Sequence, residues 1–470
     1  MLETYGHGGD WQTARQLYGR DEFVDFSSNM NPLGPPPAVR DILQGGMDWI
    51  VRYPDPAVRE LRSKLARLHG IPEESILVGN GAAELIDLAV RLIRPWQAIL
   101  AKPCFGEYEE AVVKVGGDVH SIPLKEANGF RLEQGQVEEM LTRLNAGSSG
   151  GDRPLAGAWR EGQRGEKSTR PSDEARGKAP DAIRSEQADG AKDAILAAAR
   201  NGLADEDPLL YQSDVSHSAA GPDLWILGSP NNPTGQLLDD SVLEAIRESG
   251  RILLLDEAFM DFVEREEEGR ASKVQAATRD KNLLVLRSMT KFYSIPGIRL
   301  GYIVSHPDRI AELRALQIPW SVNALAQAIG SAVVDDRDFV RRTEAWLREE
   351  GPWLAQRLRH LGLTVYPSVV NYLLVRLPDS SGWTAALLQE AMGRRGVLIR
   401  DASRMGNLSS AYIRLAVKAR RDHERLLAAL EECLRLGPAA LASADDVADD
   451  DDARKAGPGQ TEKTRGEDRS

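Results

Sequence analysis

SMTKFYSIPGIRLGY, residues 288–302, is the stretch that decides how this chain is interpreted, because one short segment holds a serine, a lysine and an arginine. The three residues are Ser288, Lys291 and Arg299. A lysine amine can condense with an aldehyde. A hydroxyl and a guanidinium can bind phosphate oxygens through charge-assisted hydrogen bonds. The segment therefore carries the groups that a small ligand with an aldehyde and a phosphate would need.

Two motifs upstream add groups that suit an aromatic ring. SPNNPTG at residues 229–235 contains Asn232, and the apolar run of LLLDEAF at 253–259 ends at Asp256. An aspartate at the end of a buried strand can keep a pyridine nitrogen protonated. An asparagine amide can donate to a phenolate oxygen. The spacing and order of Asn232, Asp256 and Lys291 favour one site over three unrelated residues.

A glycine turn nearer the N-terminus completes the pattern. VGNGAAELI at residues 78–86 reads as a strand end, a turn and a helix start, so Gly81, Ala82 and Ala83 can present backbone amides to a phosphate. A single glycine turn or a single lysine is a weak signal, and a lone lysine is usually a solvated charge. Together the four segments predict a pyridoxal phosphate site whose catalytic residues are Lys291 and Asp256.

Composition and charge agree with a soluble enzyme. The chain has 470 residues, 42% of them hydrophobic, which is enough for a large core and more than one domain. Its net charge of -12 argues against a general nucleic-acid binder. Cys104 and Cys433 give no disulfide framework. With neither a signal peptide nor a long apolar run, we expect a cytoplasmic protein with no membrane association and no metal site.

Apolar runs alternate with helical patterns, which predicts an α/β fold: a mainly parallel sheet covered by helices on both faces, plus a smaller α+β domain. The strands expected in the large sheet are 75–80, 98–103, 224–229, 251–259, 283–289 and 301–305. The smaller domain is expected to contain a helix at 338–362 and strands at 365–377, 396–401 and 411–417. The site residues then fall at strand ends and in the following loops, where open α/β sheets bind ligands.

Composition changes along the chain suggest its division into parts. We expect an N-terminal arm or lid at 1–45, a major cofactor-binding domain at 46–334 and a minor domain at 335–436. Residues 146–222 are low in aromatic residues and rich in small and charged ones, which predicts an insertion within the major domain. Residues 437–470 contain an acidic run and are predicted to be a disordered tail.

Several motifs resemble a known family. They are GHGGD at 6–10, VDFSSNMNPLGPP at 24–36, RYPDP at 52–56, DEAFMDF at 256–262 and PWSVNALAQ at 319–327. With the cofactor motifs they are similar to the fold type I pyridoxal phosphate enzymes, in the branch that contains histidinol-phosphate aminotransferase. The resemblance covers residues 1 to about 145 and 222 to about 435, and within that branch it is greatest to the threonine-phosphate decarboxylases of cobalamin synthesis.

The resemblance implies decarboxylation of L-threonine O-3-phosphate to (R)-1-aminopropan-2-ol O-2-phosphate and carbon dioxide. A histidinol-phosphate or related aminotransferase is the main alternative, and a catalytically silent regulatory protein on the same scaffold is a third reading. Aminotransferase relatives usually carry a tyrosine where this chain has Phe259, and they lack the His-Gly-Gly opening. The residues do not themselves show which bond at the substrate's α carbon breaks.

The resemblance also assigns substrate contacts. It implies that Arg414 holds the α-carboxylate, that Arg400 lies on the side of the substrate's phosphate, and that His7, Gly8 and Asn29 reach the substrate from an N-terminal lid. Asn232 is expected to contact both cofactor and substrate.

Two aromatic residues receive roles in the same way. Phe105 is expected to stack on the pyridine ring. Tyr53 is expected to reach the cofactor phosphate of a second subunit, which implies a homodimer with sites at its interface.

Overall fold

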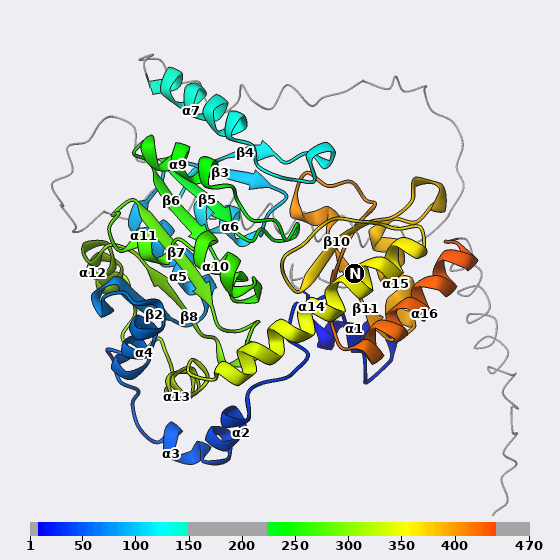
Figure 1. Cartoon of the computed structure of the whole chain (residues 1–470), viewed down its shortest axis with the longest axis horizontal. Coiled ribbons are helices and arrows are strands. Elements are labelled where there is room, and N and C mark those ends of the chain that lie inside the picture. The colour runs from blue at the N-terminus through cyan, green and yellow to red at the C-terminus, as the bar shows by residue number, and fades with distance from the viewer. Residues whose placement is uncertain (1–7, 149–222, 439–470) are drawn as a thin grey trace, which may run out of the picture.

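The computed structural model describes residues 8–148 and 223–438, and its centre is a seven-stranded sheet (Figure 1). From one edge to the other the strands are β2 (Ile76–Gly79), β8 (Gly301–Val304), β7 (Leu283–Ser288), β6 (Ile252–Asp256), β5 (Asp223–Gly228), β3 (Gln97–Lys102) and β4 (Asp118–Pro123). β8 runs antiparallel to both of its neighbours, and the other pairs are parallel. The predicted mainly parallel sheet is confirmed.

Alternate side chains along these strands enter two different cores. In β6, Leu254 belongs to one core and Leu253 and Leu255 to the other, because successive side chains of a strand point to opposite faces. One face packs against α5 (Ala82–Ile93), α6 (Glu107–Lys114) and α12 (Pro307–Leu316). The other packs against α4 (Arg59–His69), α9 (Asp240–Glu248), α11 (Val274–Ala277) and α13 (Ala324–Val333). Burial on both faces explains why the strands other than β4 are largely apolar. β4, at the edge, is largely exposed and was not predicted.

A smaller antiparallel sheet has a core of its own. In spatial order its strands are β12 (Arg400–Asp401), β13 (Tyr412–Ala416), β10 (Tyr372–Arg376) and β9 (Thr364–Val365). The helices around it are α14 (Arg337–His360), α15 (Ala385–Arg394) and α16 (Arg420–Leu436). Figure 1 shows α14 spanning from the region of the large sheet to the smaller one.

The N-terminal segment joins the smaller sheet region through backbone pairing. β1 (Val24–Asp25) pairs in parallel with β11 (Val397–Leu398). The other helices are α1 (Trp11–Tyr18), α2 (Pro37–Gln44), α3 (Gly46–Ile50), α7 (Gln134–Ser148) and α10 (Arg265–Ala271). Because α7 extends to Ser148, the first residues of the predicted insertion are helical. The rest of that insertion, His7 and nearly all of the predicted acidic tail lie outside the described residues.

One predicted strand is broken. The run 365–377 forms a strand only at its two ends, in part because Pro367 has no N–H for a ladder. The backbone between these ends binds the loop that carries Asn232 instead. Val369 N–H donates to the Gly235 carbonyl at 3.1 Å. The irregular segment thereby connects the smaller sheet to the candidate site.

Among the residues that the structure describes, we find no helix both long and apolar enough to span a lipid bilayer.

Candidate active site

Lys291 lies in the loop that follows β7, and its amine points at a hydroxyl. Lys291 Nζ donates to Ser288 Oγ at 3.0 Å and lies 5.4 Å from the centre of the Phe259 ring. Burial lowers the pKa of Lys291, the nearby carboxylate of Asp256 opposes that shift, and the Arg299 charge adds to it. A lowered pKa leaves more of the amine neutral, which is the form that attacks an aldehyde.

Asp256 is the last residue of β6, and hydrogen bonds hold both of its carboxyl oxygens. The Tyr108 hydroxyl donates to Oδ2 at 2.5 Å, and the Ala258 N–H donates to Oδ1 at 2.9 Å. Burial raises the pKa of Asp256, whereas the Tyr108 hydrogen bond and the charge of Lys291 lower it. The carboxyl group is therefore fixed in direction, next to a cation, at the end of a buried strand.

Tyr108 is a residue of this site that the sequence analysis missed. It is buried in the first turn of α6, and its ring meets that of Phe105 edge to face, with centroids 5.6 Å apart. The signal that could have found it is the aromatic pair in KPCFGEYEEA, since residues three apart at a helix start lie on one side. If Phe105 lies against the ring of a bound ligand, Tyr108 is placed to hold the Asp256 carboxylate beside that ring.

The N-terminus of α5 and an arginine form a cradle with no room for a side chain. Gly81 precedes the helix with φ 84°, and a Cβ there would lie 2.7 Å from Arg299 Nη2. A Cβ on Gly301 would lie 3.1 Å from the Ala82 nitrogen. Ala83, the next residue of the helix, is exposed. Free backbone amides of a first helical turn beside a guanidinium form an anion site.

Two buried arginines lie opposite each other on neighbouring strands of the smaller sheet. Arg414 Nη1 donates to Asn232 Oδ1 at 2.8 Å, and Nη2 donates to the Ser27 carbonyl at 2.6 Å. The Arg414 guanidinium lies 5.6 Å from the centre of the Tyr372 ring. Arg400 is the register partner of Arg414, so both side chains point to the same face of the sheet.

The N-terminal segment contacts both the surroundings of Arg414 and the loop that carries Lys291. Gly8 lies so close to the Ser27 carbonyl that a Cβ would clash with it, and Asn29 is buried. Asn31, which was not predicted, donates its N–H to the Lys291 carbonyl at 3.1 Å. Its side-chain amide donates to the Phe292 carbonyl at 2.9 Å. The segment after β1 thus fixes the backbone that carries Lys291.

Tyr53 lies on the surface. It is 82% exposed, and its ring centroid is 5.1 Å from that of Trp320. Residues of the loop around Trp320, with Asp55 and Val58, line a surface hollow of about 240 Å³. The position of Tyr53 leaves its hydroxyl open to another molecule.

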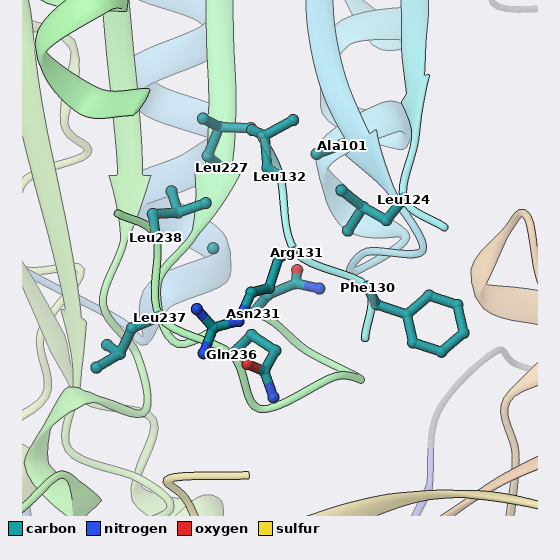
Figure 2. Close-up of a pocket in the computed structure, with 11 residues that line it drawn as sticks. Ala101, Leu124, Phe130, Arg131, Leu132, Leu227, Asn231, Gln236, Leu237 and Leu238 are labelled. Atoms are coloured by element: carbon teal, nitrogen blue, oxygen red, sulfur yellow. The ribbon is translucent and has the colours of Figure 1, made fainter. Parts of the chain in front are cut away.

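A small apolar pocket beside Asn231 is separate from this site. Figure 2 shows it between the chain around Phe130 and Leu132 and the loop around Gln236. Lys291 and Asp256 are not among its lining residues. It lies between the ends of β3 and β5 and is lined in part by the loop that carries Asn232.

The residues fit pyridoxal phosphate. The cradle at Gly81 and Arg299 would accept a phosphate, and a Cβ at Gly81 would fill it. The fixed carboxyl of Asp256 suits a protonated ring nitrogen, and the Lys291 amine suits the aldehyde. The motif residues thus come from separate strand ends to one region of the fold, with Arg414 bonded to Asn232 at its edge.

Comparison with known proteins agrees with this geometry. The family model for aminotransferase class I and II matches residues 21–150 and 210–432. The chain is 33% identical to a threonine-phosphate decarboxylase from Salmonella typhimurium over 91% of this chain and 96% of that protein.

Two solved structures share the fold. L-threonine-O-3-phosphate decarboxylase from Porphyromonas gingivalis superimposes with a TM-score of 0.61 at 23% identity, covering 87% of this chain and 98% of that one. Histidinol-phosphate aminotransferase from Sinorhizobium meliloti, solved in complex with pyridoxal-5'-phosphate, gives 0.67 at 18% identity, covering 93% and 97%. The expected fold type I architecture is confirmed.

Proposed function

Because the chain belongs to the aminotransferase class I and II family, we propose that it is a pyridoxal phosphate-dependent threonine-phosphate decarboxylase. It would convert L-threonine O-3-phosphate to (R)-1-aminopropan-2-ol O-2-phosphate and carbon dioxide, for adenosylcobalamin biosynthesis. The identity of 33% over 91% of the chain supports this choice over transamination.

The cofactor roles are assigned by the chemistry of each side chain. Pyridoxal phosphate, when bound, supplies a protonated ring that accepts the electron pair of the bond broken at the substrate's α carbon. Asp256 would hold the proton on the ring nitrogen, Asn232 would donate to the phenolate oxygen, and Phe105 would lie against the ring. The phosphate would be held by Gly81, Ala82, Ala83, Ser288 and Arg299. Lys291 would hold the aldehyde and move a proton at the substrate's α carbon.

One observation carries the substrate assignment: the buried guanidiniums of Arg400 and Arg414 point to the same face of the sheet, and Arg414 is bonded to Asn232. Threonine phosphate has two anionic groups, a carboxylate and a phosphate, and each would need a cation when buried. Arg414 would hold the carboxylate, and Arg400 would lie towards the phosphate. Histidinol phosphate has no carboxylate, but the keto acid of an aminotransferase has, so the arginines support an acidic substrate and the choice between the two reactions rests on the sequence identity.

His7, Gly8 and Asn29 would close over the substrate from the N-terminal segment. The contact of Gly8 with the Ser27 carbonyl, which also accepts from Arg414, supports a lid that senses the substrate's carboxylate. We also propose a cytoplasmic homodimer in which Tyr53 of one subunit reaches the cofactor phosphate of the other. The exposure of Tyr53 supports that role.

Product analysis tests the reaction. Threonine phosphate labelled with ¹³C in its carboxyl group should release labelled carbon dioxide, with one aminopropanol phosphate formed for each molecule released. An Arg414→Met variant should lose this reaction while still binding pyridoxal phosphate, because its charge is needed for the carboxylate. A keto-acid product that retains the label would instead support an aminotransferase.

A further inference from the structure

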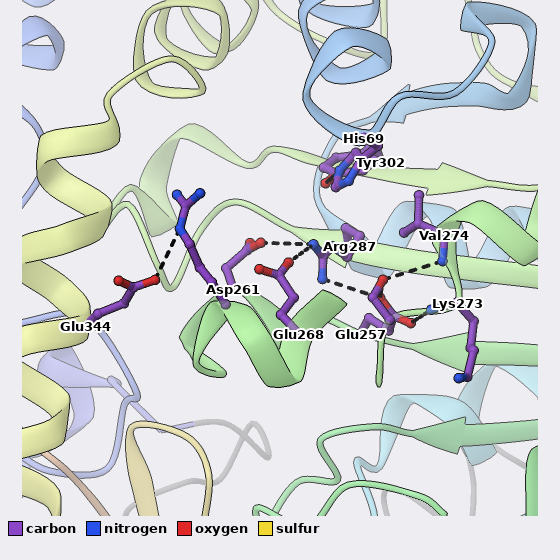
Figure 3. A network of polar contacts seen from close by, with 11 residues as sticks. His69, Glu257, Asp261, Glu268, Lys273, Val274, Arg287, Tyr302 and Glu344 are labelled. Atoms are coloured by element: carbon purple, nitrogen blue, oxygen red, sulfur yellow. Dashed lines mark hydrogen bonds and ion pairs between the residues drawn. The ribbon is translucent and has the colours of Figure 1, made fainter. Parts of the chain in front are cut away.

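A buried arginine lies behind the site, on the opposite face of the sheet. Arg287 in β7 is 1% exposed, and three carboxylates surround it. Figure 3 shows the cluster, in which Nη1 of Arg287 lies 3.3 Å from Glu257 Oε2 and Nη2 lies 3.2 Å from Asp261 Oδ1 and 2.7 Å from Glu268 Oε1. Burying the charges of Arg287 and Glu257 is costly unless their geometry is good and further hydrogen bonds satisfy them, whereas Asp261 and Glu268 stay partly exposed.

The positions of these residues relate them to the site. Glu257 follows Asp256 directly, and Arg287 directly precedes Ser288. Because side chains alternate along a strand, Asp256 and Ser288 point to the face of α5 and α6. Glu257 and Arg287 point to the other face, beside Tyr302 of β8. The ion pair therefore links the residue next to Asp256 with the residue next to Ser288.

The same cluster holds the segment that follows β6. Glu257 accepts from the Lys273 N–H and the Ser272 hydroxyl, each at 2.7 Å. Asp261 and Glu268 stand on either side of the start of α10 and both reach Arg287. Phe259, whose ring lies under the Lys291 amine, is inside the loop that these contacts close.

We propose that Arg287 is a positioning residue for the cofactor site, acting through the backbone of β6 and β7. Its pair with Glu257 fixes the separation between Asp256 and Ser288. Its contacts with Asp261 and Glu268 fix the loop that places Phe259 beneath Lys291. This inference rests on the proposed pyridoxal phosphate site.

The test measures cofactor binding and cofactor geometry separately from turnover. The full-length apoenzyme of the wild type, Arg287→Met and Arg287→Lys would be titrated with pyridoxal phosphate, and the visible circular dichroism of the bound cofactor recorded. We expect Arg287→Met to bind about tenfold more weakly and to show an altered visible signal, as when a group that orients a ligand is lost. Arg287→Lys should recover part of the affinity and part of the visible signal. Lysine keeps the positive charge but lacks the planar guanidinium that can bind two carboxylates at once.

The matched control is Arg251→Met. Arg251 lies just before β6, at the opposite end of the strand, and pairs with Asp223 at 2.8 Å in a partly buried bridge. It should lower the unfolding temperature but leave the dissociation constant and the visible signal at wild-type values. Equal effects from Arg251→Met, or a wild-type signal and affinity in Arg287→Met, would overturn the proposal.

Two further outcomes are distinguishable. If Arg287→Met does not fold, Glu257→Gln carries the same test, with binding weakened about fivefold. Wild-type affinity in that variant would contradict the positioning role. A wild-type protein that binds no pyridoxal phosphate would contradict the proposed function itself.

Discussion

At the scale of single residues, the chemistry depends on two buried groups of opposite charge. Burial lowers the pKa of Lys291 and raises that of Asp256, and each charge opposes the shift of the other. Removing one member of such a pair leaves the other charge uncompensated, which typically costs about 3–5 kcal/mol. Substitutions here should therefore change both the affinity for the cofactor and the protonation of the remaining partner.

Lys291→Ala should abolish the visible absorption band that pyridoxal phosphate gives on binding the enzyme, because no other amine of the motif is placed to hold the aldehyde. Borohydride reduction followed by mass spectrometry should find the added mass on Lys291 in the wild type and nowhere in the variant. Lys281→Ala is the control, since this exposed lysine pairs with Glu312 on the surface. A persisting band in Lys291→Ala would show that another lysine holds the cofactor.

Tyr108→Phe should move the acid limb of the pH profile of kcat/KM to higher pH. The Tyr108 hydrogen bond lowers the pKa of Asp256, so its loss raises that pKa, and the carboxylate becomes protonated sooner as pH falls. At the pH optimum, loss of one hydrogen bond to a charged group should cost about tenfold in kcat/KM. Tyr412→Phe serves as control, and its pH profile should match that of the wild type. Superimposable pH profiles for Tyr108→Phe and the wild type would contradict the role of the Tyr108 hydroxyl.

The residues that could be predicted are those whose signal is local. Lys291, Asp256 and Gly81 each stand in a short motif at a strand end or helix start. Asn31 could not be found in this way, because its side chain acts through Phe292, 261 positions away in the chain. Tyr108 left only the indirect signal of its spacing from Phe105, since its partner Asp256 lies 148 positions away. Such contacts depend on the packing of whole elements, which no short window of sequence contains.

At the scale of elements, six strands of the large sheet were predictable because burial on both faces requires an unbroken apolar run. The edge strand β4 was not predicted, because it is largely exposed and has no such run. The smaller sheet was harder to predict. Its run at 365–377 has the composition of one strand, but its middle binds the Asn232 loop through Val369, and that partner lies in another part of the chain. The Arg287 cluster behind β6 and β7 was likewise invisible, since its charges in sequence resemble solvated ones.

Glu257 makes the stability of this region depend on pH. Burial raises its pKa from 4.5 to about 7 in the folded protein. The protonated Glu257 side chain therefore contributes to the free energy of unfolding fully below pH 4.5. This contribution, on the order of 3 kcal/mol, is lost as pH rises towards 7. Urea unfolding across this range should show a smaller loss for Glu257→Gln than for wild type. Parallel stability curves would contradict the raised pKa.

At the scale of the whole molecule, apolar side chains are exposed around α3 and the loop before α13. The most exposed are Met47, Ile50, Val51, Tyr53 and Ile318, each more than 60% exposed. Tyr53 and Trp320 bring the two segments into contact. A contiguous apolar surface is typical of an association site. The sequence predicted a homodimer only through its resemblance to a known family. The exposed apolar surface could not be predicted, because the exposure of a side chain depends on the folded chain.

Val51→Asp combined with Ile318→Asp should convert the proposed dimer to a monomer, because it would place two charges in an apolar interface. Sedimentation velocity would measure the change. Affinity for pyridoxal phosphate should fall in the same variant, as Tyr53 of the other subunit is lost from the phosphate. Leu68→Asp, at an exposed apolar residue elsewhere, should alter neither. A dimer that persists in the double variant would place the interface on another surface.

The count of turnovers with L-threonine O-3-phosphate and pyridoxal phosphate, in the absence of any keto acid, tests the proposed reaction most directly. A decarboxylase recovers its aldehyde cofactor in each cycle, so we predict many molecules of aminopropanol phosphate and carbon dioxide per site, with the visible band retained. An aminotransferase would stop after one half-reaction. A single conversion that leaves pyridoxamine phosphate, or turnover only with histidinol phosphate and 2-oxoglutarate, would contradict the account.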